Sequence, residues 1–252
     1  MGGCVGVMGR SHLVSGLILG GVIATTLSHA PLAVRLLVIP VAGGSALLPD
    51  IDKPGSRVAR SLGPVTGLIS RGVAAVAVAV YHATRTERDS PSDNGGHRRL
   101  SHTVPGCLLF GVFVAGAMLV HPAAGTVVLA LLTGLTAQGF KALGGWFTLS
   151  GLVGSWLVVS QHQGWWWVFP VAVALGSWVH CWGDTVTSSG TPMWWPLLRD
   201  GKRWGKVTTP ATFDTNDHIE HGPVTVVLWA GFVVSMGFAS GVSQLVIRAV
   251  LA

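Results

Sequence analysis

Long apolar segments separated by short polar stretches run through almost the whole chain. Most of these segments approach the roughly 20 residues that a helix needs to cross a bilayer. They lie at residues 13–28, 32–48, 64–82, 103–120, 123–143, 146–160, 165–182 and 223–247. The pattern predicts an all-α fold, a polytopic helical integral membrane protein in which short turns connect neighbouring helices.

One of these segments, residues 64–82, carries a charge near its middle. A charged side chain at the bilayer centre costs at least about 2.5 kcal/mol, and Arg71 would lie there if the segment crossed. We therefore expect an interfacial or partly re-entrant helix here, which leaves about seven transmembrane helices plus one interfacial helix. All Lys and Arg residues except Arg35 and Arg248 then fall on one side, which the positive-inside rule assigns to the cytoplasm. The polar stretches 49–63, 83–102 and 183–222 share that face.

Composition supports a membrane protein over a soluble one. Half of the 252 residues are hydrophobic and only 10% are charged, whereas a soluble domain carries roughly 25% charged residues. We read residues 1–252 as one membrane-embedded domain, and the bilayer is the first expected partner. The net charge of +6 is explained by basic residues that flank the helices and are attracted to anionic lipid headgroups. We therefore do not expect nucleic acid as a partner. The three cysteines form no spaced pair, which argues against a disulfide framework or a cysteine-based zinc site.

Histidine and aspartate residues gather at the ends of the apolar segments. His180 and Asp184 stand four residues apart, so on a helix they share one face and can hold one metal ion. The alternative for this pair is a hydrogen bond at a helix end. The other members of the group are His12 before the first segment, Asp50 and Asp52 after the second, and His97 and His102 before the segment at 103–120.

Each of the other clusters also has a plain structural interpretation. His12 fits a polar helix start. Asp50 and Asp52 fit a helix-ending turn, although in an extended segment their alternation would point both carboxylates one way. The stretch that holds His97 and His102 fits a solvated basic loop, although Arg98 and Arg99 within it could instead hold a phosphate.

Taken together, the clusters predict a divalent metal site on the cytoplasmic face. Mixed imidazole and carboxylate ligands suit Zn²⁺, with Mn²⁺ as the alternative, in a site of one or two ions. Hydrolysis is the natural reaction for such a site. We expect Asp52 or Glu220 to act as general base and Arg98, with Arg99, to stabilise an anionic transition state. A phosphoester or a lipid-like substrate fits a site at headgroup depth, and an ester or amide stays open.

The motifs also resemble those of a known family. In order, the chain carries Ser11 and His12, LLPDIDKPGS at 47–56, GHRRLSHT at 96–103 and HCWGDTVTSSGTPMWWP at 180–196. This set resembles the YdjM-like family of bacterial inner-membrane-associated, metal-dependent hydrolases, one of whose members is described as binding the LexA repressor. The resemblance implies a polytopic helical hydrolase of the bacterial inner membrane and a possible cytoplasmic regulatory protein as partner.

Matching the family motifs residue by residue marks the expected site. The matches are His12, Asp50, Asp52, His97, Arg98, His102, His180 and Asp184. A final glutamate is usual in the family and falls on Glu220, but Asn216 stands where a glycine is expected.

Two other classes of function remain as alternatives. A transporter would place its carboxylates and histidines near the bilayer midplane, whereas here they stand at segment ends. A regulatory or scaffold protein would use the loops at 83–101 and 197–222 to bind a cytoplasmic partner. That function does not explain why the histidine and aspartate motifs occur together.

Overall fold

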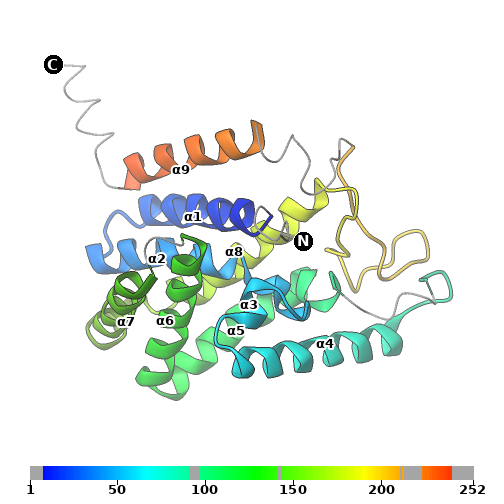
Figure 1. Ribbon diagram of the computed structural model, residues 1–252, viewed down its shortest axis with the longest axis horizontal. Helices are drawn as coiled ribbons and strands as arrows, with labels where there is room; N and C mark the ends of the chain where they lie inside the picture. Colours follow the sequence, from blue (N-terminus) through cyan, green and yellow to red (C-terminus); the bar gives the residue numbers. More distant parts are fainter. Residues whose placement is uncertain (1–7, 91–96, 141–143, 211, 213–222, 240–252) are drawn as a thin grey trace, which may run out of the picture.

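The computed structural model describes residues 8–90, 97–140, 144–210, 212 and 223–239, and within them the chain is helical, with no strand (Figure 1). The all-α prediction is confirmed. The longer helices are α1 (Met8–Thr26), α2 (Leu32–Ser45), α4 (Pro64–Thr84), α5 (Val104–Val120), α6 (Pro122–Gly139), α7 (Gly144–Gln161), α8 (Val168–Thr185) and α9 (Thr225–Ala239). The short helices are η1 (Leu48–Asp52), α3 (Arg57–Arg60), η2 (Leu100–His102) and η3 (Gln163–Trp165).

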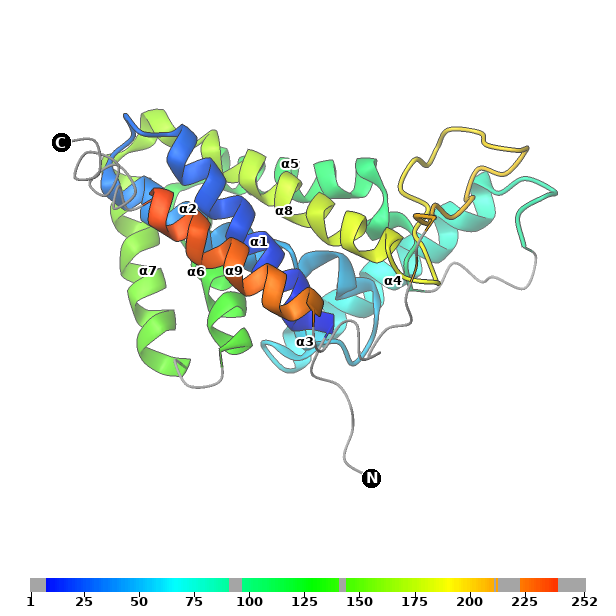
Figure 2. The same ribbon diagram turned by 90° about the horizontal axis from the view of Figure 1, so that it is seen from above.

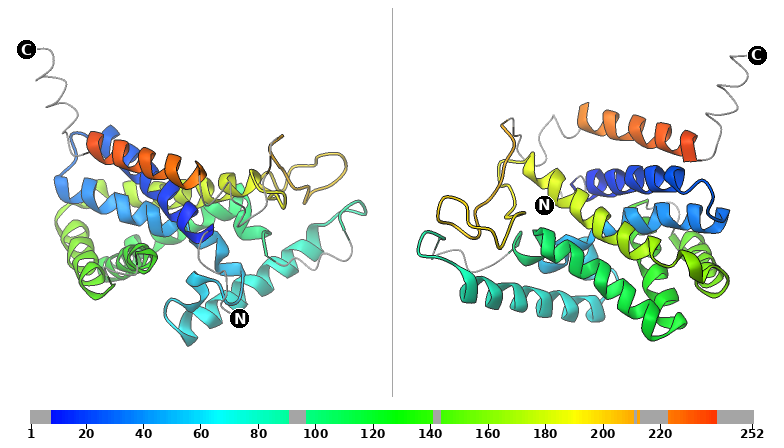
Figure 3. Two further views of the ribbon diagram at one scale, coloured as in Figure 1. Left: turned by 45° about the horizontal axis from the view of Figure 1, so that its top comes forward. Right: turned by 180° about the vertical axis from the view of Figure 1, so that it is seen from behind.

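Helix α2 lies at the centre of the bundle and packs against α1, α6, α7 and α8. Small residues allow the closest of these contacts. A Cβ atom at Gly20 of α1 would lie 2.6 Å from the Ile39 Cα atom of α2, and one at Gly176 of α8 would lie 2.7 Å from the Ala42 carbonyl oxygen. Glycines at such positions let helix backbones approach directly, as is common in membrane bundles. Helix α9 covers the outer side of α1, as both views of Figure 3 show.

The structure does not confirm the predicted number of seven membrane spans. Among the described residues, three stretches are long and apolar enough to cross a bilayer: Leu32–Asp52, Pro64–Thr84 and Pro122–Gly139. Three shorter apolar helices are Val104–Val120, Leu149–Gln161 and Thr225–Phe238. Helices α1 and α8 are long enough but not apolar enough to be counted among these stretches. The reason is polar side chains near their ends, Arg10 and His12 at the start of α1 and His180 and Asp184 at the end of α8.

Helix α4 stands apart from α6, α7 and α9 (Figure 2). It packs mainly on α3, η1 and η2 and leaves most of its surface exposed. The sequence predicts this segment to be interfacial because of Arg71, yet by length and composition it is one of the three that could cross. Its few contacts with the long helices agree with an interfacial position.

The ends of four elements meet at one place in the fold. These are the start of α1, the short helix η1 that follows α2, the helix η2 that precedes α5, and the last turn of α8. Every predicted site residue that the structure describes lies on these elements or in the loop just before η2. The packing of α2 against α1 and α8 therefore brings together motifs that are far apart in the sequence.

Candidate metal centre

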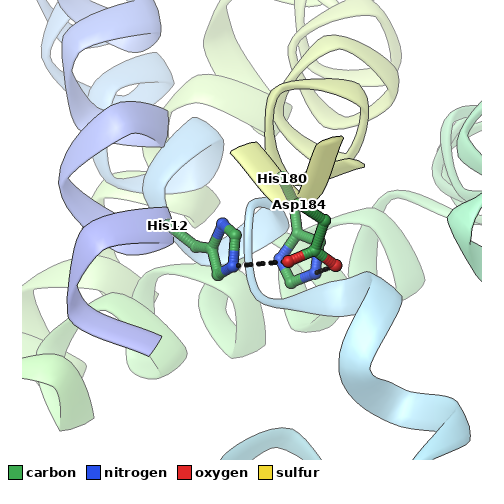
Figure 4. Close-up of side chains that lie close together, drawn as sticks. All are labelled: His12, His180 and Asp184. Atoms are coloured by element: carbon green, nitrogen blue, oxygen red, sulfur yellow. Dashed lines mark ion pairs between the residues drawn. The ribbon is translucent and has the colours of Figure 1, made fainter. Parts of the chain in front are cut away.

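The last two turns of α8 present His180 and Asp184 on one face, as their spacing predicts. Their side chains point toward the first turn of α1 (Figure 4). Both residues are buried, and the His180 Nε2 atom lies 3.5 Å from Asp184 Oδ2. A contact with the C-terminal end of α2 orients the His180 ring. Helix α2 ends with carbonyl groups that lack helical partners, and the Nδ1 atom of His180 donates to one of them, the Ala46 oxygen, at 2.8 Å.

Asp50 and Asp52 lie on the 3₁₀ helix η1. The segment is therefore not extended, and the alternation considered for it does not apply. This short helix begins at Leu48 and has Pro49 in its first turn, and the Ile51 side chain between the two aspartates is buried in the hydrophobic core. Asp52 is 3% exposed, whereas the Asp50 side chain keeps 28% of its surface. Asp50 thus lies on the open side of the cluster and Asp52 beneath it.

The loop from His97 to His102 wraps around the Asp52 carboxylate. The His97 Nδ1 atom lies 2.9 Å from Asp52 Oδ1, while the Ser101 hydroxyl and the Arg98 backbone N–H donate to Oδ2 at 2.7 and 3.2 Å. Arg98 adopts the left-handed conformation, with φ of 65°, which is uncommon for a residue other than glycine. This turn lets the backbone and both flanking histidines approach one carboxylate.

Four ligand atoms from three parts of the chain converge at the centre of the cluster. His102 Nε2 and His180 Nε2 lie 3.3 Å apart. Asp50 Oδ1 is 3.8 and 3.7 Å from these two nitrogens, and Asp184 Oδ2 is 3.6 and 3.5 Å from them. A tetrahedral zinc site with ligands at about 2.0–2.1 Å has edges of about 3.3–3.4 Å. The five separations lie at or slightly above this edge length, so the cluster has the size of a metal site.

Hydrogen bonds determine which histidine nitrogen is free to bind a cation. The Nδ1–H of His180 must donate, because its partner is a carbonyl oxygen. The Ser101 hydroxyl gives its one proton to Asp52, so it accepts from the Nδ1–H of His102. In a neutral imidazole the other nitrogen is then an acceptor. With both imidazoles neutral, the two Nε2 lone pairs face each other, so either a metal cation or a proton on one of the rings must lie between them.

The Asp184 carboxylate supports the same conclusion. Its Oδ1 atom accepts from Arg98 Nη2 at 2.9 Å, but its Oδ2 atom is buried and has no hydrogen-bond partner in the described structure. An unpartnered, buried, charged oxygen costs more than the roughly 1–3 kcal/mol of a neutral group. Because Oδ2 is the atom that faces His102 and His180, a cation at this point would satisfy it. The residues present therefore fit a divalent metal ion.

His12 reaches the cluster from α1 and packs on its far side. Its ring stacks on that of His180 at 3.8 Å between centroids, and its Nε2 atom lies 3.3 Å from Asp184 Oδ1 (Figure 4). Gly183 makes room for this ring, because a Cβ atom there would lie 3.2 Å from two His12 atoms. Two three-residue groups could each hold an ion: His12 with His180 and Asp184, and Asp50 with His97 and His102.

Arg98 and Arg99 are buried, at 7% and 3% exposure, which does not fit a solvated basic loop. The Arg98 guanidinium is engaged within the protein, since it also donates to the Thr187 hydroxyl at 2.9 Å. Arg99 lies over the Tyr81 ring, 4.8 Å from its centroid. Arg98 thus contacts the Asp184 oxygen that faces away from His102, and Arg99 packs on Tyr81 near the end of α4.

Burial also sets the protonation state expected at the centre. It lowers the pKa of His102, although the Asp52 carboxylate beside it acts in the opposite direction. The neutral imidazole, which is the form that binds a metal, is therefore favoured at neutral pH. His97 and Asp50 each keep 28% of their side-chain surface exposed, so they mark the accessible side.

Several contributors to the site were missing from the sequence-based prediction. Ser101, Thr187 and the Ala46 carbonyl orient the histidines and Arg98. Ser101 and Thr187 stand within the motifs at 96–103 and 180–196, but no role was predicted for either. A backbone carbonyl at a helix end has no signature in side-chain patterns. The predicted general base Glu220 lies outside the described residues.

Comparisons with known proteins identify the family of the chain. No curated protein and no solved structure matches the chain significantly. The sequence model described as "YdjM inner membrane protein" matches residues 7–247, which is nearly the whole chain and includes every described site residue. The chain therefore belongs to the YdjM inner membrane protein family, and its place is the inner membrane.

Proposed function

We propose that this protein is a metal-dependent hydrolase that acts on a phosphoester at the cytoplasmic face of the inner membrane. One observation carries the proposal. Two imidazole nitrogens and two carboxylate oxygens converge at separations close to those of a zinc site, and one of the oxygens, Asp184 Oδ2, is buried with no hydrogen-bond partner among the described residues.

The ligands in this proposal are Asp50, His102, His180 and Asp184. A set of two nitrogen and two oxygen donors favours Zn²⁺, whereas Mn²⁺ prefers an octahedral, oxygen-rich site. Two carboxylates also balance the charge of one divalent ion. His12 and His97 border the cluster on opposite sides, so a second ion would recruit them.

The orienting contacts follow a pattern that is typical of metal sites. Ligating histidines usually donate their second N–H to a carboxylate or a backbone carbonyl. Here His180 donates to Ala46, and His102 is linked to Asp52 through Ser101. Arg98 occupies one oxygen of Asp184 and leaves the other for the ion.

A bound divalent ion would lower the pKa of a water molecule and polarise a phosphoryl oxygen. The protein contributes a proton acceptor on the accessible side. Both Asp52 oxygens already accept hydrogen bonds, so Asp52 does not take the proton itself. It accepts a hydrogen bond from the Nδ1–H of His97 and thereby leaves the Nε2 atom of that ring as the proton acceptor. His97 Nε2 takes a proton from the attacking water as the new P–O bond forms. It returns that proton to the leaving oxygen as the ester bond breaks. Glu220 remains the alternative base.

The accessible side of the cluster suggests a membrane-derived substrate. Asp50 and His97 are its most exposed members, and the basic residues Lys53, Arg57 and Arg60 follow η1 directly in the sequence. Such positive charge near a membrane surface attracts anionic headgroups. A phosphoester with an acyl or isoprenoid tail is therefore the first substrate class to test.

Metal analysis of the purified full-length protein tests the proposal. We expect about one zinc per chain in the wild type and a loss in His180→Ala and Asp184→Ala. His29→Ala is the matched control, because His29 is an exposed histidine in the turn after α1. Wild-type metal content in both site variants would refute the centre. Full metal loading without hydrolysis across a panel of phosphodiesters and ester substrates would refute the enzyme while leaving the metal site.

A further inference from the structure

A second site lies beside α4, outside the metal centre. The segment from Pro54 to Gly63 and the first two turns of α4 enclose a groove of about 660 Å³. Among its lining residues are Gly55, Arg60, Gly67, Ser70 and Arg71. None of the predicted metal ligands lines it.

The groove is positively charged. Arg60 and Arg71 are among its lining residues, and no acidic residue of the described part of the chain lines it. Neither arginine forms an ion pair with a carboxylate in the described part of the chain. Positive charge extends beyond the groove, because Arg10 and Arg57 lie near Arg60. Burial and the repulsion from Arg10 and Arg60 lower the pKa of Arg57. An anion in the groove would relieve this repulsion.

An unpartnered hydroxyl supplies an independent sign of a ligand. Ser70 is fully buried, lines the groove, and its Oγ atom has no hydrogen-bond partner within the described residues. Helical serines usually donate to the carbonyl four residues earlier, as Ser45 and Ser155 do in this chain. The Ser70 hydroxyl is therefore a free donor in a wall that also carries two arginines.

The surface next to the groove is apolar. Val65, Leu68, Ile69 and Val76 of α4 are between 49 and 72% exposed. Leu68 belongs to both surfaces, because it lines the groove and is the most exposed of the four. The charged groove thus opens directly onto an apolar helix face. A free phosphate would use only the groove, whereas an amphiphile would use both.

We propose that the groove between Pro54 and Arg71 binds the phosphate headgroup of an acidic phospholipid, with the acyl chains along the exposed face of α4. Arg60, Arg71 and the Ser70 hydroxyl donate to the phosphate oxygens, since guanidinium groups form strong charge-assisted hydrogen bonds with phosphate. Gly67 keeps the floor open, because the nearest atom to a Cβ there is the Ala59 oxygen at 3.8 Å. The bound lipid offsets the charge of Arg71 and holds α4 at the membrane surface. This site does not depend on the proposed hydrolase activity.

Lipid binding to the delipidated full-length protein in a nonionic detergent, followed by native mass spectrometry, tests the proposal. We expect phosphatidylglycerol to bind at least about tenfold more tightly than phosphatidylcholine with the same acyl chains, because both carry the phosphate but only phosphatidylcholine carries a choline cation, which Arg60 and Arg71 would repel. The double variant Arg60→Gln/Arg71→Gln should lose this preference. The matched control Arg199→Gln/Lys202→Gln removes two exposed basic residues elsewhere and should keep it.

A second variant separates the groove from general charge and from misfolding. Gly67→Leu fills the groove, leaves every charge in place and replaces glycine with a better helix former. It should also weaken phosphatidylglycerol binding about tenfold.

Three results would overturn the proposal: equal binding of both lipids by the wild type, an equal loss in the Arg199 and Lys202 control, or unchanged binding by Gly67→Leu. Displacement of the lipid by inorganic phosphate or by glycerophosphoglycerol at the same concentration would assign the groove to a soluble phosphate instead.

Discussion

Replacing Arg98 with methionine tests how the metal centre is held together. The Arg98 guanidinium donates to Asp184 Oδ1 and to the Thr187 hydroxyl, both at 2.9 Å, and its side chain and that of Asp184 are 8% and 1% exposed. Methionine keeps much of the length and apolar contact of the side chain but removes the charge. The Asp184 carboxylate then stays buried without its strongest donor.

The size of the effect should depend on the metal. Breaking a buried ion pair by removing one partner costs about 3–5 kcal/mol. In the metal-free protein we expect Arg98→Met to be destabilised by an amount in this range. Without this donor the Asp184 carboxylate is held less well in its ligating orientation, so we expect the variant to bind metal about 10–100-fold more weakly, as for other residues that orient metal ligands. By linkage, the metal then stabilises the variant less than the wild type, so the loss of stability should be larger with the metal bound than without it.

Two measurements decide the matter. Thermal unfolding in detergent, with and without a chelator, gives the destabilisation in each state, and competition with a chromophoric chelator gives the metal affinity. Arg99→Met is the control, because Arg99 is equally buried but lies over Tyr81, away from Asp184. Unchanged metal affinity in Arg98→Met would refute the orienting role. An equal loss in both variants would attribute the effect to burial of charge in this loop.

Three further predictions concern other parts of the fold. Gly183→Ala places a Cβ atom 3.2 Å from the His12 ring, so it should displace that ring and lower metal affinity several-fold by the chelator assay, and an unchanged affinity would exclude His12 from the centre. Gly20→Leu should destabilise the fold by at least about 1–3 kcal/mol through overpacking, whereas Gly116→Ala, whose added Cβ atom would have no described atom within 4 Å, should be neutral in the same unfolding assay. Burial alone would raise the pKa of Asp89, but three backbone N–H groups donate to it and hold that pKa below 3.8. Its contribution to stability is therefore complete above the unfolded-state pKa of about 3.9 and is lost as the pH falls through the lower folded-state value. Unfolding midpoints between pH 3 and 6 should fall more steeply in the wild type than in Asp89→Asn, and parallel curves would contradict this account.

Much of this protein can be derived from its sequence because the relevant signals are local. A helix places residues four apart on one face, so the spacing of His180 and Asp184 already implied that they act together. Apolar length located the helices α2, α4 and α6 to within a few residues. The polar clusters at segment ends followed from the cost of placing such groups inside a bilayer, and that cost predicted that His12, Asp50 and His102 would share one region.

Tertiary structure decided what each of these residues contacts. The close approach of α1, α2 and α8 at glycine positions brings the Ala46 carbonyl under His180 and places His12 on Asp184, and no sequence spacing encodes such contacts. The left-handed turn at Arg98 directs its guanidinium toward Asp184, so a residue expected to meet an anionic substrate is held within the protein. Likewise, Asp52 is surrounded by donors from the loop at 97–102. Periodicity along a chain reports which face of an element is apolar, but which side chains meet depends on the packing of distant elements. His180 and Asp184 were therefore predictable as a pair, and only the fold joined them to His102 and Asp50.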